Sequence, residues 1–94
     1  MSYKLQFQIA ALDEWRRLDG SIREQFKRKL SERLQMPRVP SAVLHGMPDC
    51  YKIKLRSAGL RLIYRVDDAV VTVFVLAVGK RERNQVYVSA QQRI

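Results

Sequence analysis

The sequence predicts an α+β domain in which helices pack against one face of a small, mostly antiparallel β-sheet. Alternating polar and apolar residues predict strands near the start of the chain and again from residue 50 onward. Between them, apolar residues recur at helical spacing and predict a helical hairpin on that face. The expected order is β-α-α-β-β-β-α, and the 94 residues are expected to form one domain, 1–94.

The first strand and the first helix follow from a change of period. Residues 3–9 alternate between apolar and polar side chains, as expected for a half-buried strand. Residues 10–18 change to helical spacing, which predicts that Ile9 and Trp15 face inward.

The second helix is predicted to begin after a break at Asp19. Ser21 is expected as its N-cap, with Glu24 completing a capping box, and Pro37 ends the pattern. The apolar stripe consists of Ile22, Phe26, Leu30 and Leu34. Trp15 and Phe26 are expected to pack in the core and not to stack on bases. Residues 37–48 hold all three prolines and are expected to form a loop.

Residues 50–66 predict a β-hairpin with its turn at residues 57–59. If the apolar faces of its strands coincide, position 56 pairs with 61, 54 with 63 and 52 with 65. The opposite face then stacks five cations, Lys52, Lys54, Arg56, Arg61 and Arg65. Because like charges facing each other destabilise a sheet, this pattern indicates a surface that binds a polyanion.

After a turn at residues 67–68, residues 70–78 are apolar on both faces, which predicts a central strand. A final helix is expected over residues 82–93. The cations Lys80, Arg81 and Arg83 precede it or lie at its start, where a bound phosphate would be favourable. Helical spacing puts Arg83 beside Tyr87, a pairing suited to single-stranded RNA, although a solvated helix with Tyr87 over the sheet fits equally well.

Composition limits the functional classes. The net charge of +9 favours nucleic acid, an anionic surface or an acidic protein as partner. One cysteine, Cys50, allows no disulfide framework or metal cluster within the chain. The sequence starts without a signal-peptide pattern, and its longest apolar run is too short to span a bilayer, so a cytoplasmic location is expected.

Several of these residues together resemble the RelE family of toxins, the mRNA interferases of bacterial and archaeal toxin–antitoxin pairs. The likeness runs through almost the whole chain and is strongest in residues 47–57, Gly59, Arg61-Leu62, Tyr64, residues 79–83 and Tyr87. It implies a fold likened to microbial ribonucleases, in agreement with the element order above. It also implies a ribosome-dependent endoribonuclease that cuts mRNA in the A site, by attack of a 2′-OH on the adjacent phosphate.

The resemblance also implies roles for individual residues. Lys52 and Lys54 match the active-site lysines, with Lys54 the candidate general base. Arg61 matches the arginine that neutralises the phosphate, Arg81 the candidate general acid, and Tyr87 the aromatic residue that stacks on the substrate base. Arg56, Arg65, Lys80 and Arg83 are expected to contact RNA or the ribosome. His45 stands where the family pattern has arginine, and is either a weaker phosphate contact or an extra acid/base group.

The residues by themselves support part of this assignment. Clustered cations lower the pKa of a lysine among them, which makes a base available nearer neutrality. Arginine stays charged and suits a phosphorane-like transition state. As an acid, however, guanidinium releases protons poorly, so Arg81 could serve only to stabilise the leaving oxygen.

Two other functions remain open. A toxin like ParE, which poisons gyrase, shares the architecture but does not need both strand lysines together with Tyr87. A non-catalytic RNA- or ribosome-binding module would use the same cations for sequence-independent affinity. The implied partners are the ribosome with its mRNA, a RelB-like antitoxin that is acidic where it covers this face, and operator DNA bound by the toxin–antitoxin complex. No metal or organic cofactor is implied, because 2′-OH attack needs none.

Overall fold

A computed structural model describes residues 2–94, and the predicted order of strands and helices is confirmed. The strands are β1 (Lys4–Phe7), β2 (Cys50–Leu55), β3 (Leu60–Asp67) and β4 (Thr72–Lys80). The helices are α1 (Ile9–Arg16), α2 (Gly20–Gln35) and α3 (Gln85–Gln92). Short 3-10 turns are η1 (Pro40–Ala42), η2 (Arg56–Ala58) and η3 (Glu82–Asn84). None of the helices within residues 2–94 has both the length and the apolar composition needed to cross a membrane.

The four strands form one sheet in the order β1-β4-β3-β2. β1 runs parallel to β4, and the other two pairings are antiparallel, as predicted. β4 therefore lies in the interior of the sheet, with strands on both sides. The expectation of a central strand is confirmed, although it covers Thr72–Lys80 and includes Gly79. β1 and β2 are the two edge strands.

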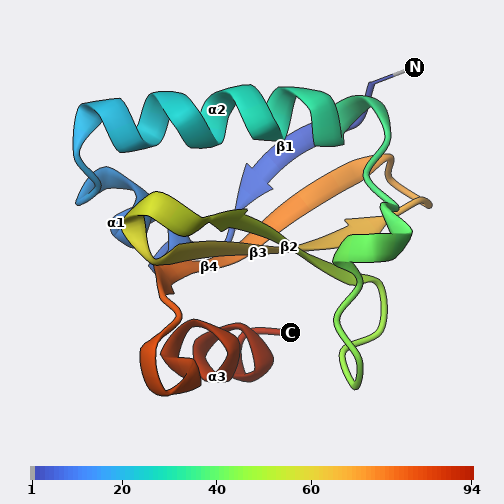
Figure 1. Cartoon of the computed structure of the whole chain (residues 1–94). Helices are drawn as coiled ribbons and strands as arrows, with labels where there is room; N and C mark the ends of the chain where they lie inside the picture. Colours follow the sequence, from blue (N-terminus) through green and yellow to red (C-terminus); the bar gives the residue numbers. More distant parts are fainter. Residues whose placement is uncertain (1) are drawn as a thin grey trace.

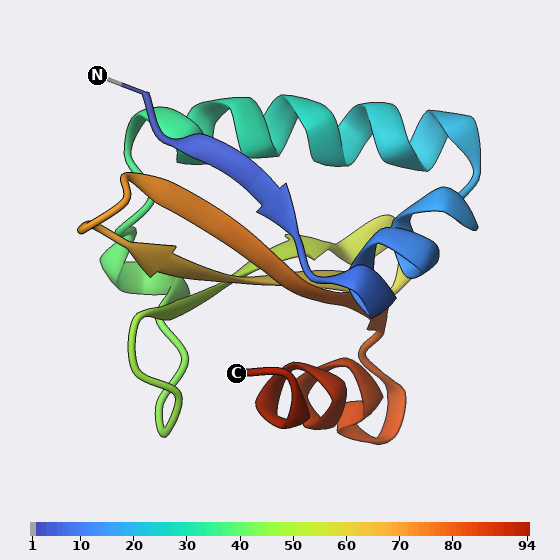
Figure 2. The same cartoon turned by 180° about the vertical axis from the view of Figure 1, so that it is seen from behind.

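The helices lie on both faces of the sheet, and the expectation that they share one face is wrong for α3. Figures 1 and 2 show α2 across one face and α3 across the other. Helices α1 and α2 contribute Ala11, Phe26 and Leu30 to the first core, with Trp15 packed against it. A second cluster under α3 contains Met47, Cys50, Ile63, Leu76, Ala77, Val86 and Ala90. Because β4 is apolar on both faces, the sheet needs cover on each of them.

The hairpin of β2 and β3 is confirmed, but its predicted register is wrong by two residues. Lys54 pairs with Arg61, Lys52 with Ile63, and Leu55 with Leu60. Arg56 does not extend the strand because the chain turns through η2, which Gly59 closes at a φ of 64°. The face assignment is unaffected, since a shift of two residues keeps every side chain on its face.

Three local expectations in the N-terminal part are also wrong. Asp19, not Ser21, is the N-cap of α2, because its carboxylate accepts hydrogen bonds from the Ser21 backbone N–H (3.1 Å) and hydroxyl (2.6 Å). A carboxylate also interacts favourably with the positive end of the helix dipole. β1 ends at Phe7, since the Gln8 side chain caps α1. Ile9 is 81 % exposed and does not face inward.

The expected final helix begins later than predicted. Arg83 and Asn84 adopt left-handed backbone conformations, with φ of 54° and 56°, and α3 starts at Gln85. The residues before it form η3, a single tight turn. Arg83 therefore does not share a helical face with Tyr87.

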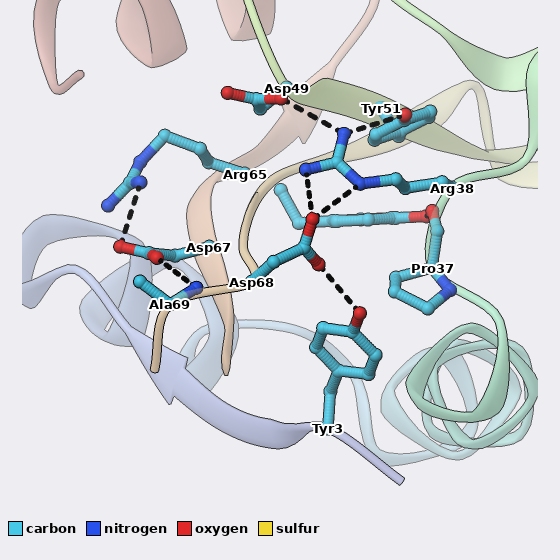
Figure 3. A network of polar contacts seen from close by, with 10 residues as sticks. Tyr3, Pro37, Arg38, Asp49, Tyr51, Arg65, Asp67, Asp68 and Ala69 are labelled. Carbon is cyan, nitrogen blue, oxygen red and sulfur yellow. Dashed lines mark hydrogen bonds and ion pairs between the residues drawn. The ribbon is translucent and has the colours of Figure 1, made fainter. Parts of the chain in front are cut away.

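A network of polar side chains lies at the end of the sheet opposite the turn between β2 and β3 (Figure 3). Arg38 donates to Asp68 at 2.9 Å and to Asp49 at 2.9 Å, and Tyr3 donates to Asp68 at 2.6 Å. The Tyr3 hydrogen bond, followed by Arg38, lowers the pKa of the Asp68 carboxyl. The network links the N-terminal strand, the loop after α2 and the turn between β3 and β4.

Candidate active site

The hairpin brings basic side chains from two strands together. β2 supplies Lys54 and β3 supplies Arg61, and these two residues are directly paired across the strands. Paired positions on an antiparallel sheet have Cβ atoms about 4.5–5.5 Å apart, on the same face. The like charges are therefore held side by side by the backbone pairing of β2 with β3.

A small open cavity lies at this position. It has a volume of about 340 Å³ and is lined by Lys54, Arg56, Arg61 and Arg81. Arg81 reaches it from the end of β4, because its backbone N–H donates to the Gly59 carbonyl at 3.1 Å. All four lining residues are cationic. The arrangement suits an anion with several oxygen atoms, such as a phosphate.

The surrounding charges change the chemistry of Lys54. The pKa of its ammonium group is lowered, first by Lys52 and then by Arg56, with smaller contributions from desolvation, Arg61 and Arg81. Each neighbouring cation disfavours the protonated form of the lysine. This is the direction expected from the sequence, and it makes Lys54 a better proton acceptor near neutral pH.

Arg61 is an unusually buried guanidinium. The residue is 7 % exposed, and its Nη1 donates to its neighbour's carbonyl, Leu60 O, at 2.9 Å. Its Nε is buried and has no hydrogen-bond partner among residues 2–94. An unmade hydrogen bond on a buried donor costs about 1–3 kcal/mol.

The predicted stack of five cations is only partly found. Lys54, Arg56 and Arg61 line the cavity. Lys52 does not line it, but its charge lowers the pKa of Lys54. Arg65 does not join them, because it lies four positions along β3 from Arg61, about 13 Å at the usual rise of a strand. There it pairs with Asp67 at 3.7 Å and lies 4.8 Å from the centre of the Phe74 ring.

The other predicted site residues do not line the cavity. Lys80 is the exposed last residue of β4, and Arg83 is exposed in η3. Tyr87 lies on α3, half-buried against the second core cluster, which is the packing that the sequence left open as its alternative. His45 is exposed in the loop before β2, next to Gly46.

Sequence analysis did not single out the basic residues of α2 that face the hairpin. Lys29 and Arg33 lie across from Lys52 and Lys54 in a second, larger groove. The excess of basic residues in this helix can be read from the sequence, which has five cations and two acids between residues 21 and 35. The helical period alone did not identify which of these cations face β2.

Comparison with known proteins shows the family to which the chain belongs. Residues 5–85 match a family model described as the ParE toxin of the type II toxin–antitoxin system, parDE. Over 94 residues the chain is 57 % identical to the mRNA interferase toxin RelE of Escherichia coli K12, covering 100 % of this chain and 99 % of the relative. The mRNA interferase RelE of Shigella flexneri matches equally well.

Solved structures give the same result. The free-state structure of the E. coli toxin RelE R81A/R83A mutant superposes with a TM-score of 0.93 at 55 % identity, covering 100 % of this chain and 99 % of that chain. The toxin in the intact E. coli RelBE toxin–antitoxin complex superposes with a TM-score of 0.84 at 57 % identity. That match covers 87 % of this chain and 100 % of the other.

Proposed function

This chain belongs to the RelE family of type II toxins, and we propose that it is a ribosome-dependent endoribonuclease that cuts mRNA in the ribosomal A site. The observation that carries the proposal is the pairing of Lys54, whose pKa is lowered, with the buried Arg61 in a wholly cationic cavity. A cavity of this kind binds phosphate and also supplies a base.

In the proposed reaction the 2′-oxygen of one nucleotide attacks its own 3′-phosphate. Neutral Lys54 takes the proton from the 2′-OH, and the bond from phosphorus to the 5′-oxygen of the next nucleotide breaks. The leaving 5′-oxygen takes a proton from water, so cleavage leaves a 2′,3′-cyclic phosphate and a 5′-OH. Arg61 neutralises the extra charge on the phosphoryl oxygens, a contribution that typically reaches about 3–4 kcal/mol for one donor. Arg61 supplies this charge from a fixed position.

Other residues have supporting roles in the proposal. Lys52 holds down the pKa of Lys54. Arg81 stabilises the leaving 5′-oxygen by its charge, ahead of any donation of a proton. Tyr87 stacks on the substrate base, and Arg56, Lys80 and Arg83 contact the RNA backbone. Whether His45 contacts phosphate or acts as an acid/base group stays a prediction, and Arg65 is already engaged by Asp67 and Phe74.

The proposed partners follow from the relatives. One relative is described in an intact RelBE toxin–antitoxin complex, and another with a peptide of the antitoxin RelB. We expect a RelB-like antitoxin whose segment over the cationic cavity is acidic, and operator DNA bound by the complex. A neutral or basic segment there would contradict this expectation. A substrate held on ribosomes also implies a cytoplasmic location.

A gyrase poison is the second candidate, because the matching family model carries the name of ParE. We favour the ribonuclease for two reasons. The relatives that match over the full chain at 57 % identity are both named mRNA interferases. A gyrase poison also has no evident use for a lysine with a lowered pKa opposite a buried arginine.

The test compares one mRNA programmed on ribosomes with the same RNA free in solution, and maps the new 5′ ends. We expect cutting in the A site on ribosomes only, with loss of cutting but retained ribosome binding for Lys54→Ala. Cutting of both RNAs would remove the ribosome dependence. No cutting of either RNA, with growth still arrested on expression, would favour the gyrase poison.

A further inference from the structure

We propose that the groove between α2 and β2 binds the stretch of RNA that flanks the scissile phosphate. This inference rests on the proposed function, because it assigns a course to the RNA outside the catalytic cavity. The groove has a volume of about 660 Å³, compared with about 340 Å³ for the cavity. The groove is thus roughly twice the size of the cavity.

The walls of the groove carry an excess of positive charge. The charged lining residues are Lys29, Glu32, Arg33, Lys52, Lys54 and Arg56, five cations against one acid. On α2, Lys29 and Arg33 are four residues apart and so lie on one face of the helix. The opposite wall is the edge of β2. Two basic walls from different elements face the same channel, which is the arrangement that tracks a phosphate backbone.

The groove is continuous with the catalytic cavity. Lys54 and Arg56 line both of them, so an RNA strand leaving the cavity at these residues enters the groove. The continuity favours the substrate strand over an unrelated RNA, because the two sites share side chains.

The free edge of β2 could instead receive an extended peptide, but part of its backbone groups already have partners. The Cys50 carbonyl accepts from Leu44 N–H at 2.9 Å, and the Lys52 carbonyl accepts from Arg33 Nη1 at 3.0 Å. Backbone groups on one edge alternate along a strand, so the Lys52 N–H and the two backbone groups of Lys54 are left on this edge. A peptide adding to the edge would gain few hydrogen bonds, whereas the lysine and arginine side chains suit a polyanion without them.

Arg33 and Lys29 have different parts in this arrangement. Arg33 also donates to the Tyr64 hydroxyl at 2.9 Å, so its guanidinium is fixed between helix and sheet. Lys29 is exposed, and its flexible stem leaves its ammonium group able to follow a phosphate. Lys29 is therefore the residue to change, because its replacement does not disturb a packed contact.

The test uses uncleavable 2′-O-methyl RNA of mixed sequence, as a trinucleotide and extended by six nucleotides on the 5′ or the 3′ side. Wild type, Lys29→Gln and Arg28→Gln are titrated over a range of salt concentrations. Arg28 is the matched control, because it is exposed on the same helix and is turned about 100° from Lys29. The assay requires no cleavage and no ribosome, so its result is independent of whether the chain is an enzyme.

We expect the wild type to bind the RNA extended on one side more tightly than the trinucleotide. Lys29→Gln should lose this gain in affinity. The slope of log K against log salt for the extended RNA should fall by about 0.7 in Lys29→Gln, the loss of one phosphate contact on a single strand. Arg28→Gln should keep the gain and the slope. The proposal is overturned if neither extension tightens binding, or if both variants behave alike. It is equally overturned if Lys29→Gln weakens binding of polyglutamate and leaves RNA binding unchanged.

Discussion

Lys54 is distinguished from an ordinary surface lysine by the residues that surround its ammonium group. Lys52, Arg56, Arg61 and Arg81 all lower its pKa, and Lys52 contributes most. Three of these neighbours come from the hairpin and one from the end of β4, so the pKa depends on tertiary structure. The sequence predicted the direction of the change, because the alternation on β2 places Lys52 and Lys54 on one face.

The pH dependence of cleavage should report this coupling. Removing the charge at position 52, as in Lys52→Gln, relieves repulsion against protonated Lys54, and the pKa of Lys54 then rises toward its usual value. The limb in which the single-turnover rate rises with pH reports deprotonation of the base, and its midpoint should move to higher pH. An unchanged midpoint, or one that moves equally in Arg28→Gln, would contradict Lys54 as the base.

The hairpin of β2 and β3 is the element that assembles the site, and its turn sets the register. The face of the sheet to which each side chain points could be predicted from the sequence, because polar and apolar residues alternate with a period of two. The register could not, since pairing 54 with 61 and pairing 54 with 63 give the same faces. The geometry of the turn decides between them, and η2 with Gly59 in a left-handed conformation takes Arg56 out of the strand.

The other elements show the same limit. The start of α3 was missed because Arg83 and Asn84 take left-handed conformations without a glycine to indicate it. The position of α3 on the second face was not predicted, although a strand that is apolar on both sides requires cover on both faces of the sheet. The basic wall formed by α2 depends on which helix face meets β2, and the helix pattern alone does not identify it.

Gly59 should matter for both stability and activity. Replacing it in Gly59→Ala puts a side chain at a φ of 64°, which should lower the free energy of unfolding by about 1 kcal/mol. Its carbonyl accepts from Arg81, so cleavage should fall by more than the loss of stability explains. Chemical denaturation and single-turnover cleavage measure the two effects.

Gly79→Ala is the control for that substitution. Its added methyl would meet Val86 Cβ at 3.9 Å, an ordinary contact, and its φ lies outside the left-handed region. Stability should be kept or slightly increased. Equal destabilisation of the two variants would show that the conformation of the turn is not the cause.

At the scale of the whole molecule, the two ends of the sheet differ in charge. One end gathers cations that form no ion pair within residues 2–94 around the cavity. The other end pairs its charges in the network of Arg38, Asp49 and Asp68 (Figure 3). The net charge of +9 destabilises a compact chain by self-repulsion. The ion pairs of Arg38 with Asp49 and Asp68 reduce this repulsion at their end of the sheet. The cationic end is thereby left available for a polyanion.

The paired end should contribute stability that depends on pH. The pKa of Asp68 is lowered in the folded state, so its contribution is present above the unfolded value of about 3.9 and is lost as the pH falls through the folded value. Asp68→Asn should therefore have a lower melting temperature than wild type at neutral pH, and the difference should shrink in acid. A difference that stays constant down to the lowest pH would exclude the ionised carboxylate as its source.

In the proposed reaction the cationic cavity catalyses attack by a 2′-OH of the mRNA. The most direct measurement is single-turnover cleavage of ribosome-bound mRNA carrying one 2′-deoxynucleotide immediately 5′ of the mapped cut. We expect cleavage at that phosphate to be abolished, and unmodified mRNA to leave a 2′,3′-cyclic phosphate that Lys54→Ala no longer forms. Cleavage of the 2′-deoxy mRNA at the same phosphate and a similar rate would contradict the account, because the nucleophile would then have to be water.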